Sequence, residues 1–418
     1  MVTRRGFLKS GGIALFGVGL MGGIPPFMAQ AAATEKRSRL YKGKRVLVCI
    51  FQRGAMDGLM AVTPFQDKYF KAARPDLFTG DGSIDLDGRW GLHPSMKGFG
   101  PLFRDGRLAI VHGIGSPNNT RSHFDAQDYM ESGTPFNKGT TSGWLNRAVG
   151  LMGHDALTPF AAVSLTPALP RSLYGDNPSL AIANLQDFAI REQGDAAAAA
   201  AAAKTWESQY GKARSGLLQE TGKESFEAIR VLQSADVRHY RPANGAVYPG
   251  SPLGSSLRQI AQLIRMEVGM EVAFTESGGW DTHFNQGTDN GIFARSAADL
   301  ANSIAAFWQD LGTWQDEVTV MTMTEFGRTV RQNGTGGTDH GRGSCNFILG
   351  NGVSGGRVHG QVADLAVENL EDGRDLPVTT DFRSVFSAVA DAHLLIADDR
   401  ALFPGWDGAK PAVMKTPA

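Results

Sequence analysis

The sequence predicts an α/β protein, built on a mostly parallel sheet with helices on both faces. The first observation is a set of apolar, β-branched-rich runs with the length and pattern of strands buried on both faces. They span residues 44–51, 107–114, 272–275, 318–324 and 346–349. The second observation is a pair of amphipathic helical patterns between these runs. One pattern aligns Leu257, Ile260 and Ile264, and the other aligns Leu300, Ile304, Phe307 and Leu311. Strands that alternate with helices are typical of parallel sheets.

Length and composition limit the classes of protein that this chain can belong to. Its 418 residues fit one large α/β domain with an insertion. With 42% hydrophobic and 20% charged residues, wholesale disorder is excluded. The net charge of −1 lacks the basic excess of a nucleic-acid-binding protein, so no nucleic-acid partner is expected. Two cysteines exclude a disulfide scaffold and a Cys-rich zinc or iron–sulfur site.

The N-terminal segment predicts export. Arg4 and Arg5 are followed by Gly-Phe-Leu-Lys and by an uncharged stretch over residues 10–34, with small residues at Ala29 and Ala31. This arrangement resembles a twin-arginine (Tat) signal, which implies the Tat translocase as a partner during export and a periplasmic location. A retained membrane anchor is the alternative, but the many glycines and a Pro-Pro pair disfavour a stable span. We therefore expect residues 1–33 to be removed and no membrane span to remain.

The α/β domain is expected to cover residues 34–418, with a helical insertion at about 185–245. The insertion contains an eight-alanine run at 196–203, followed by apolar residues at roughly helical spacing. It is interpreted as a lid over a site or as a structural cap beside the sheet.

Polar motifs follow four of the predicted strands. In order, they occupy residues 53–58, 121–125, 278–283 and 324–343. In open α/β sheets, sites form beyond the carboxyl ends of the strands, so these motifs are expected to converge.

The residue types in these motifs indicate a divalent metal. His123, His283 and His340 each lie within two residues of an aspartate. Carboxylates with imidazoles suit Zn²⁺, Mn²⁺ or Fe, whereas all-oxygen sets suit Mg²⁺ and Ca²⁺. The carboxylates and imidazoles expected to converge are Asp57, Asp281, His283, Glu325, Asp339 and His340. Four carboxylates in one place repel one another, and a divalent cation would remove that conflict.

Other residues of the motifs have two interpretations each. Ser122 is either the N-cap of a helix or a nucleophile whose hydroxyl loses its proton at a metal. Arg121, Arg328 and Arg342 either bind a phosphate or sulfate group or partner the carboxylates. His123 is assigned with these arginines to substrate binding.

The five motifs resemble those of a known family. RGAMDGL, RSHFDAQD, GGWDTH, TEFGRT and GTDHGRG occur here in the order found in a Tat-exported bacterial family of unknown function, domain of unknown function family 1501. That family is similar to a branch of the alkaline phosphatase and sulfatase superfamily, whose enzymes use one or two metals and a Ser, Thr or formylglycine nucleophile. The resemblance implies an alkaline-phosphatase-like α/β fold.

The resemblance also implies roles for single residues. It matches Asp57 to the ligand after the first strand, Ser122 to the nucleophile, and Asp281 with His283 to an Asp…His ligand pair. Glu325 then replaces the aspartate of an Asp-His-Gly motif, with Asp339 and His340 as later ligands; alternatively, Asp339-His340-Gly341 is itself that motif. Neither cysteine lies in the Cys-x-Pro-x-Arg signature of formylglycine sulfatases.

Two functions follow as hypotheses. The first is an exported metal-dependent hydrolase of phosphate or sulfate esters, with a small-molecule ester as substrate. The alternative is a non-catalytic periplasmic binding or assembly protein that retains the fold.

Overall fold

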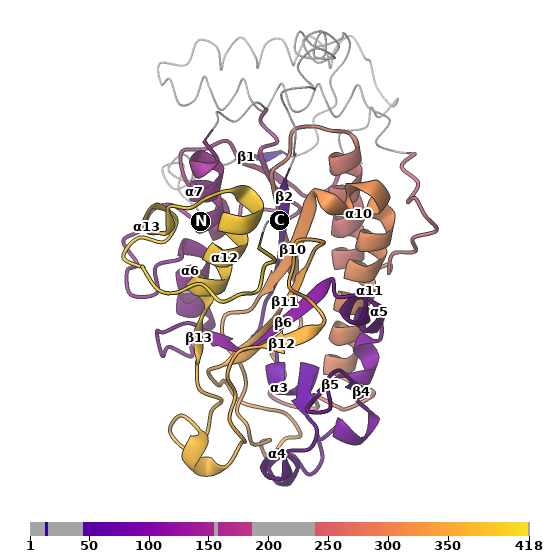
Figure 1. The fold of residues 1–418 in the computed structure, drawn as a ribbon, viewed down its shortest axis with the longest axis vertical. Coiled ribbons are helices and arrows are strands. Elements are labelled where there is room, and N and C mark those ends of the chain that lie inside the picture. The colour runs from indigo at the N-terminus through magenta and orange to yellow at the C-terminus, as the bar shows by residue number, and fades with distance from the viewer. Residues whose placement is uncertain (1–12, 16–44, 154–157, 186–238, 417–418) are drawn as a thin grey trace.

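The computed structural model describes residues 13–15, 45–153, 158–185 and 239–416. The predicted signal segment lies outside these residues except for β1, and the predicted insertion lies outside them from 186 to 238. Within the described residues, the predicted α/β architecture is confirmed: a central sheet lies between two layers of helices (Figure 1).

The large sheet has the strand order β1-β8-β7-β9-β2-β10-β11-β6-β12, and β13 pairs with β6. The strands are β1 (Ile13–Leu15), β2 (Val46–Gln52), β6 (Leu108–Gly115), β7 (Ala162–Ser164), β8 (Leu180–Ile182), β9 (Val272–Ser277), β10 (Val318–Met323), β11 (Ser344–Leu349), β12 (Arg357–His359) and β13 (Thr380–Asp381). All five strands predicted from the sequence are present. A second, three-stranded antiparallel sheet contains β3 (Val62–Pro64), β5 (Trp90–Leu92) and β4 (Ile84–Asp85).

Strand β2 shows why the central strands are apolar on both faces. All seven of its residues are buried. Val46, Val48 and Ile50 pack into one core, and Leu47 and Cys49 pack into the other. Successive side chains of a strand point to opposite faces, so a strand between two helical layers needs an unbroken apolar run.

Helices cover both faces. The predicted helices α10 (Pro252–Arg265) and α11 (Ile292–Leu311) pack in one layer with α5 (Phe99–Arg104). The opposite layer contains α6 (His123–Ser132), α7 (Trp144–Leu151), α12 (Phe382–Leu394) and α13 (Asp399–Leu402). Two short helices, α3 (Gly58–Ala61) and α4 (Lys68–Ala73), lie beyond β2. No helix in the described ranges is long and apolar enough to cross a bilayer.

One strand, β11, runs in the opposite direction to its neighbours, but the strands that precede the polar motifs still end at the same edge of the sheet. β11 is antiparallel to both β10 and β6. β10, β2 and β9 are parallel, and β6 has the same direction as β10 because both oppose β11. The four strands that precede the polar motifs therefore end at one edge of the sheet, as the sequence predicts.

Candidate metal centre

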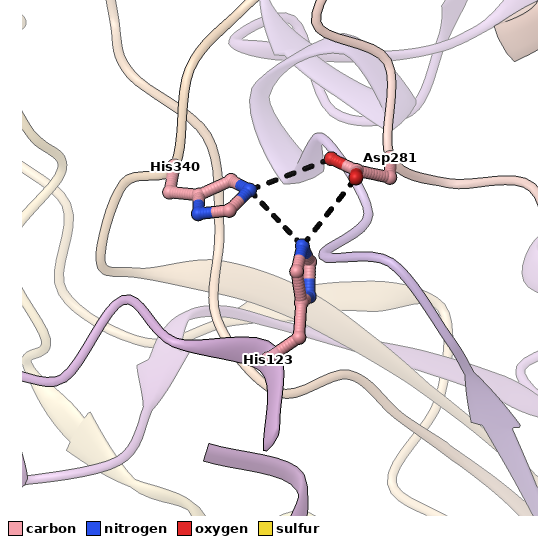
Figure 2. A group of neighbouring side chains, drawn as sticks. All are labelled: His123, Asp281 and His340. Atoms are coloured by element: carbon pink, nitrogen blue, oxygen red, sulfur yellow. Dashed lines mark hydrogen bonds and ion pairs between the residues drawn. The ribbon is translucent and has the colours of Figure 1, made fainter. Parts of the chain in front are cut away.

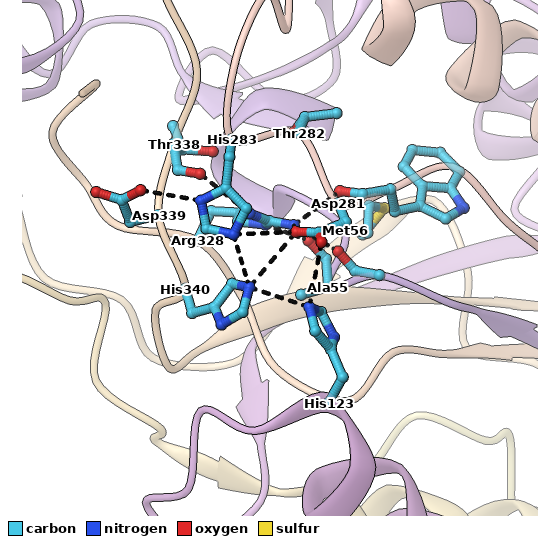
Figure 3. A network of polar contacts seen from close by, with 12 residues as sticks. Ala55, Met56, His123, Asp281, Thr282, His283, Arg328, Thr338, Asp339 and His340 are labelled. Carbon is cyan, nitrogen blue, oxygen red and sulfur yellow. Dashed lines mark hydrogen bonds and ion pairs between the residues drawn. The ribbon is translucent and has the colours of Figure 1, made fainter. Parts of the chain in front are cut away.

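Four side chains from one helix and two loops meet beyond this edge. His123 is the first residue of α6, which follows β6. Asp281 and His283 lie in the loop after β9, and His340 lies in the loop between β10 and β11. Figure 2 shows His123, Asp281 and His340 facing one another, and their ligand atoms all lie within 4.8 Å. His283 joins them through His340 and Asp281 (Figure 3).

The atoms that face each other are the Nε2 nitrogens and one carboxylate. His340 Nε2 lies 3.0 Å from His123 Nε2 and 2.9 Å from His283 Nε2. Asp281 Oδ1 lies 3.4 Å from His340 Nε2 and 3.2 Å from His283 Nε2. Asp281 Oδ2 lies 3.6 Å from His123 Nε2. A tetrahedron around Zn²⁺, with bonds of about 2.0–2.1 Å, has edges of roughly 3.3–3.4 Å, and the separations among His123, Asp281 and His340 are close to this length. His283 adjoins this group through His340 and Asp281 but is not one of the three residues whose ligand atoms all lie within 4.8 Å of one another.

The far side of each imidazole determines its tautomer. Each Nδ1 faces an oxygen that accepts hydrogen bonds. These oxygens are Glu325 Oε1 at 2.8 Å from His123, Asp339 Oδ1 at 3.0 Å from His283, and the backbone oxygen of Arg121 at 2.8 Å from His340. Each Nδ1 therefore carries a proton, and in a neutral imidazole the Nε2 then presents a lone pair. The Nε2 lone pairs of His123 and His340 converge with an Asp281 oxygen, which is a donor set for a cation, and His283 Nε2 adjoins this set.

Arg328 and the turn at Gly54 hold Asp281 in place. The guanidinium of Arg328 is buried, and its Nη2 donates to Asp281 Oδ1 at 2.6 Å. The same guanidinium donates to the backbone oxygens of Gly54, Ala55 and Thr338. Gly54 has a φ of +114°, and a Cβ there would lie 2.5 Å from the Asp281 amide nitrogen. The glycine lets the two loops approach closely.

The charged groups around the centre favour their ionised forms. Burial alone would raise the pKa of Glu325, but hydrogen bonds from His123 and Gln127 lower it below its usual value. Burial is likewise outweighed for Asp281, whose pKa is lowered by the hydrogen bond and charge of Arg328. The hydrogen bond from His283 lowers the pKa of Asp339.

The pKa values of His123 and His340 are shifted in opposite directions. The hydrogen bond to Glu325 raises the pKa of His123. Burial lowers the pKa of His340, and the neighbouring His123 and Arg328 lower it further. A proton and a cation compete for the Nε2 of His123, because both need the same lone pair.

Glu325 and Asp339 lie one layer behind the converging atoms. Glu325 is fully buried, and its Oε1 accepts hydrogen bonds from His123, from the Gly54 amide at 2.9 Å and from Gln127 at 2.8 Å. Asp339 is half-exposed and binds His283 and Asn333. Both were predicted as metal ligands, and in the structure both orient an imidazole. His123, predicted to bind substrate, faces the centre directly.

Asp57 lies in a buried ion pair instead of among the converging side chains. Its two oxygens lie 2.6 and 3.1 Å from the guanidinium nitrogens of Arg74. Gln286 Nε2 donates to Asp57 Oδ2 at 2.7 Å, and Gln286 Oε1 accepts from the hydroxyls of Thr282 and Thr338, both at 2.8 Å. Asp57 thus supports the loops that carry His283 and His340. Neither Arg74 nor Gln286 was predicted from the sequence, because neither belongs to a recognisable motif.

The other arginines are paired with acidic or carbonyl groups. Arg121 binds Asp375. Arg342 donates to Glu371 at 2.8 Å and to the backbone oxygen of Asn118 at 2.6 Å. Of the two interpretations open for these arginines, this arrangement matches the one in which they partner carboxylates.

Ser122 occupies the N-cap position of α6, yet its side chain makes no capping hydrogen bond. Its amide donates to Thr120 Oγ1 at 3.2 Å, and the residue is exposed. Ser122 thus directly precedes His123 in the chain, and its hydroxyl has no capping role.

The fold and the site define an α/β protein with a candidate centre of three histidines and one aspartate at the carboxyl edge of its sheet. Residues 85–402 match the model of the family described as "Protein of unknown function (DUF1501)". This match covers most of the chain, so the chain belongs to that family. A search of curated proteins gives no significant match.

Several solved structures are similar at low identity. The C-terminal periplasmic domain of EcEptC from Escherichia coli, in complex with Zn, is 10% identical over 74% of this chain and 73% of that chain, with a TM-score of 0.34. The PsFucS1 sulfatase from Pseudoalteromonas sp. is 12% identical over 93% and 74%, with a TM-score of 0.32. The phosphonate monoester hydrolase of Agrobacterium radiobacter is 11% identical over 88% and 79%, also at 0.32.

Proposed function

We propose that this protein is an exported metal-dependent hydrolase of phosphate or sulfate esters. The observation that carries the proposal is the convergence of the Nε2 atoms of His123 and His340 with the Asp281 carboxylate. His283 Nε2 adjoins them at 2.9 Å from His340 Nε2, and every Nδ1 faces an acceptor. His123, His283, His340 and Asp281 would hold one divalent cation, and the imidazole-rich set favours Zn²⁺. The choice of phosphate or sulfate esters rests on the resemblance of the motifs.

The chain's own groups have separate tasks in this proposal. A bound Zn²⁺ would polarise the ester and favour the deprotonated form of a nearby hydroxyl or water. Glu325, Asp339 and the Arg121 carbonyl keep the three imidazoles in the tautomer that binds a metal. Ser122 is proposed as the nucleophile, since its exposed hydroxyl makes no capping bond. Attack of the Ser122 oxygen on phosphorus or sulfur would form a seryl ester and break the bond to the alcohol oxygen, which would leave as the alcohol after taking a proton from water. A second water would then hydrolyse the seryl ester, releasing phosphate or sulfate and restoring the Ser122 hydroxyl.

Metal binding is tested on the mature protein after export and chelation. Zn²⁺, Mn²⁺, Mg²⁺ and Ca²⁺ are titrated back while the melting temperature is recorded, because a ligand bound only by the native state stabilises it. Zn²⁺ should raise the melting temperature of the wild type and not that of His340→Ala. The matched control is His359→Ala, since His359 is also half-buried but binds the backbone oxygen of Ser354. An unchanged melting temperature with all four ions would remove the metal centre.

Catalysis is tested with aryl phosphate and aryl sulfate esters on the zinc-loaded protein. The wild type should release the phenol, and both His123→Ala and Ser122→Ala should abolish release. Ser122→Ala should leave zinc affinity unchanged, because its hydroxyl is not in the donor set. Full activity of Ser122→Ala would assign the attack to water.

The second candidate is a non-catalytic binding or assembly protein that retains a structural metal. It is favoured by the engagement of Arg121, Arg328 and Arg342 with carboxylates of the protein, because a guanidinium paired in this way is less free to bind an anionic substrate. Zinc binding without release of any phenol would support this candidate.

A further inference from the structure

Two strongly exposed aromatic rings adjoin the candidate metal centre. Phe124 is 90% exposed and Phe284 is 62% exposed. Each directly follows a histidine of the centre, His123 or His283, so its Cα lies about 3.8 Å from that histidine's Cα. The backbone of each exposed ring is therefore adjacent to a histidine of the candidate centre.

A third exposed ring is brought to the same place by the chain's folding. Phe136 is 71% exposed. The residue before it, Pro135, accepts a hydrogen bond from Asn118 at 2.8 Å. Two residues after it, Lys138 forms an ion pair at 2.5 Å with Asp125, which directly follows Phe124. These contacts hold Phe136 beside the N-terminal end of α6, where Phe124 lies.

A phenylalanine ring exposed to water is unfavourable, and binding an apolar group would bury it. Each ring leaves a large apolar surface in water. We call Phe124, Phe136 and Phe284 the aromatic rim: they are exposed rings on chain segments that adjoin the candidate metal centre. The buried guanidinium of Arg328 is not available to bind a substrate, because each of its three nitrogens already donates to an oxygen of the protein.

We propose that the aromatic rim binds the apolar alcohol group of the ester, so that the preferred substrates are esters of aryl or similarly large apolar alcohols. This inference rests on the proposed function. The anionic phosphate or sulfate end would face the histidines and Asp281, and the alcohol end would stack on Phe124 and Phe284. Aromatic rings pack favourably in offset or edge-to-face arrangements, which a planar alcohol group can match.

The test uses two phosphonates that carry the same anionic group and do not undergo ester hydrolysis: phenylphosphonate and methylphosphonate. Their dissociation constants are measured by calorimetry on zinc-loaded mature protein, as the wild type and as Phe124→Ala, Phe136→Ala, Phe284→Ala and Phe124→Ala/Phe284→Ala. Zinc affinity is measured for every variant. Val367→Ala is the matched control, because Val367 is also 62% exposed but lies in a different loop.

The wild type should bind phenylphosphonate roughly tenfold more tightly than methylphosphonate, as expected from one or two aromatic contacts. The double variant should lose most of this preference while zinc and methylphosphonate bind as before, and Phe124→Tyr should keep it. Equal binding of the two phosphonates by the wild type would contradict the proposed role of the aromatic rim without contradicting the proposed hydrolase function. A preference that survives in the double variant would also overturn the rim. If zinc binds but neither phosphonate does, the proposed function fails and the rim with it.

Discussion

Replacing Glu325 by glutamine tests the centre without touching a proposed metal ligand. Glu325 Oε1 accepts three hydrogen bonds, at 2.8 Å from His123, 2.9 Å from the Gly54 amide and 2.8 Å from Gln127. A glutamine oxygen can occupy the same position and accept the same three bonds. The substitution Glu325→Gln therefore removes one buried charge and little else.

The expected effect is a weaker hold on the metal. The carboxylate increases the basicity of His123 through its Nδ1–H, and changes in such partners typically reduce metal affinity 10- to 100-fold. That range corresponds to about 1.4–2.7 kcal/mol. Because the hydrogen-bonded geometry is retained, we expect a loss nearer tenfold than a hundredfold.

The assay is competition for Zn²⁺ against a chelator of known affinity at constant pH. The control is Glu276→Gln, which removes a carboxylate that pairs with Arg53 at 2.6 Å instead of with a histidine. Zinc affinity should fall in Glu325→Gln and stay within twofold of wild type in Glu276→Gln. If both variants bind zinc as the wild type does, His123 is not a ligand oriented by Glu325, and the interpretation of the centre is wrong.

Three further outcomes are expected. Asp57→Ala should lower the free energy of unfolding by roughly 3–5 kcal/mol in denaturant, because it leaves the buried Arg74 without its partner. The control is Lys71→Ala, which removes the exposed ion pair with Asp81 and should cost under about 1 kcal/mol. Burial lowers the pKa of His393 from 6.5 to about 4, so its contribution to stability is complete above pH 6.5 and is lost as the pH falls towards 4. Between pH 6.5 and 4, the free energy of unfolding should therefore fall by up to about 3 kcal/mol less in His393→Gln than in the wild type. The same pH profile in both proteins would contradict this. Changing both arginines of the twin-arginine motif to lysine should keep the precursor in the cytoplasm on fractionation, and normal periplasmic accumulation would contradict the export prediction.

The elements of the fold could be predicted because their signals are local. The runs that became β2 and β10 are apolar without alternation, and such a pattern leaves few options except a strand buried on both faces. The helical faces of α10 and α11 follow from a 3.6-residue period. The reversed direction of β11 could not be predicted, since a buried strand has the same composition in either direction.

The convergence of the motifs also follows from the sequence, through topology alone. Motifs that follow parallel strands share one edge of the sheet, so the motifs that contain His123, Asp281 and His340 were expected together, and these three side chains lie together. Asp57 was expected to join them but lies in the buried ion pair with Arg74. This argument places residues within a region. It does not say which atoms face one another.

By itself, the sequence determined the layers of the fold and the edge at which its acidic and imidazole groups gather, because both depend on periodicity and strand order. Only the tertiary structure decided the part each group plays there. Asp57 and Asp281 each follow a strand and look alike in sequence, yet Arg74 binds the first in the interior and Arg328 turns the second towards the histidines. The difference arises from side chains that lie 17 and 47 positions away along the chain, and contacts at such separations exist only once the loops have packed.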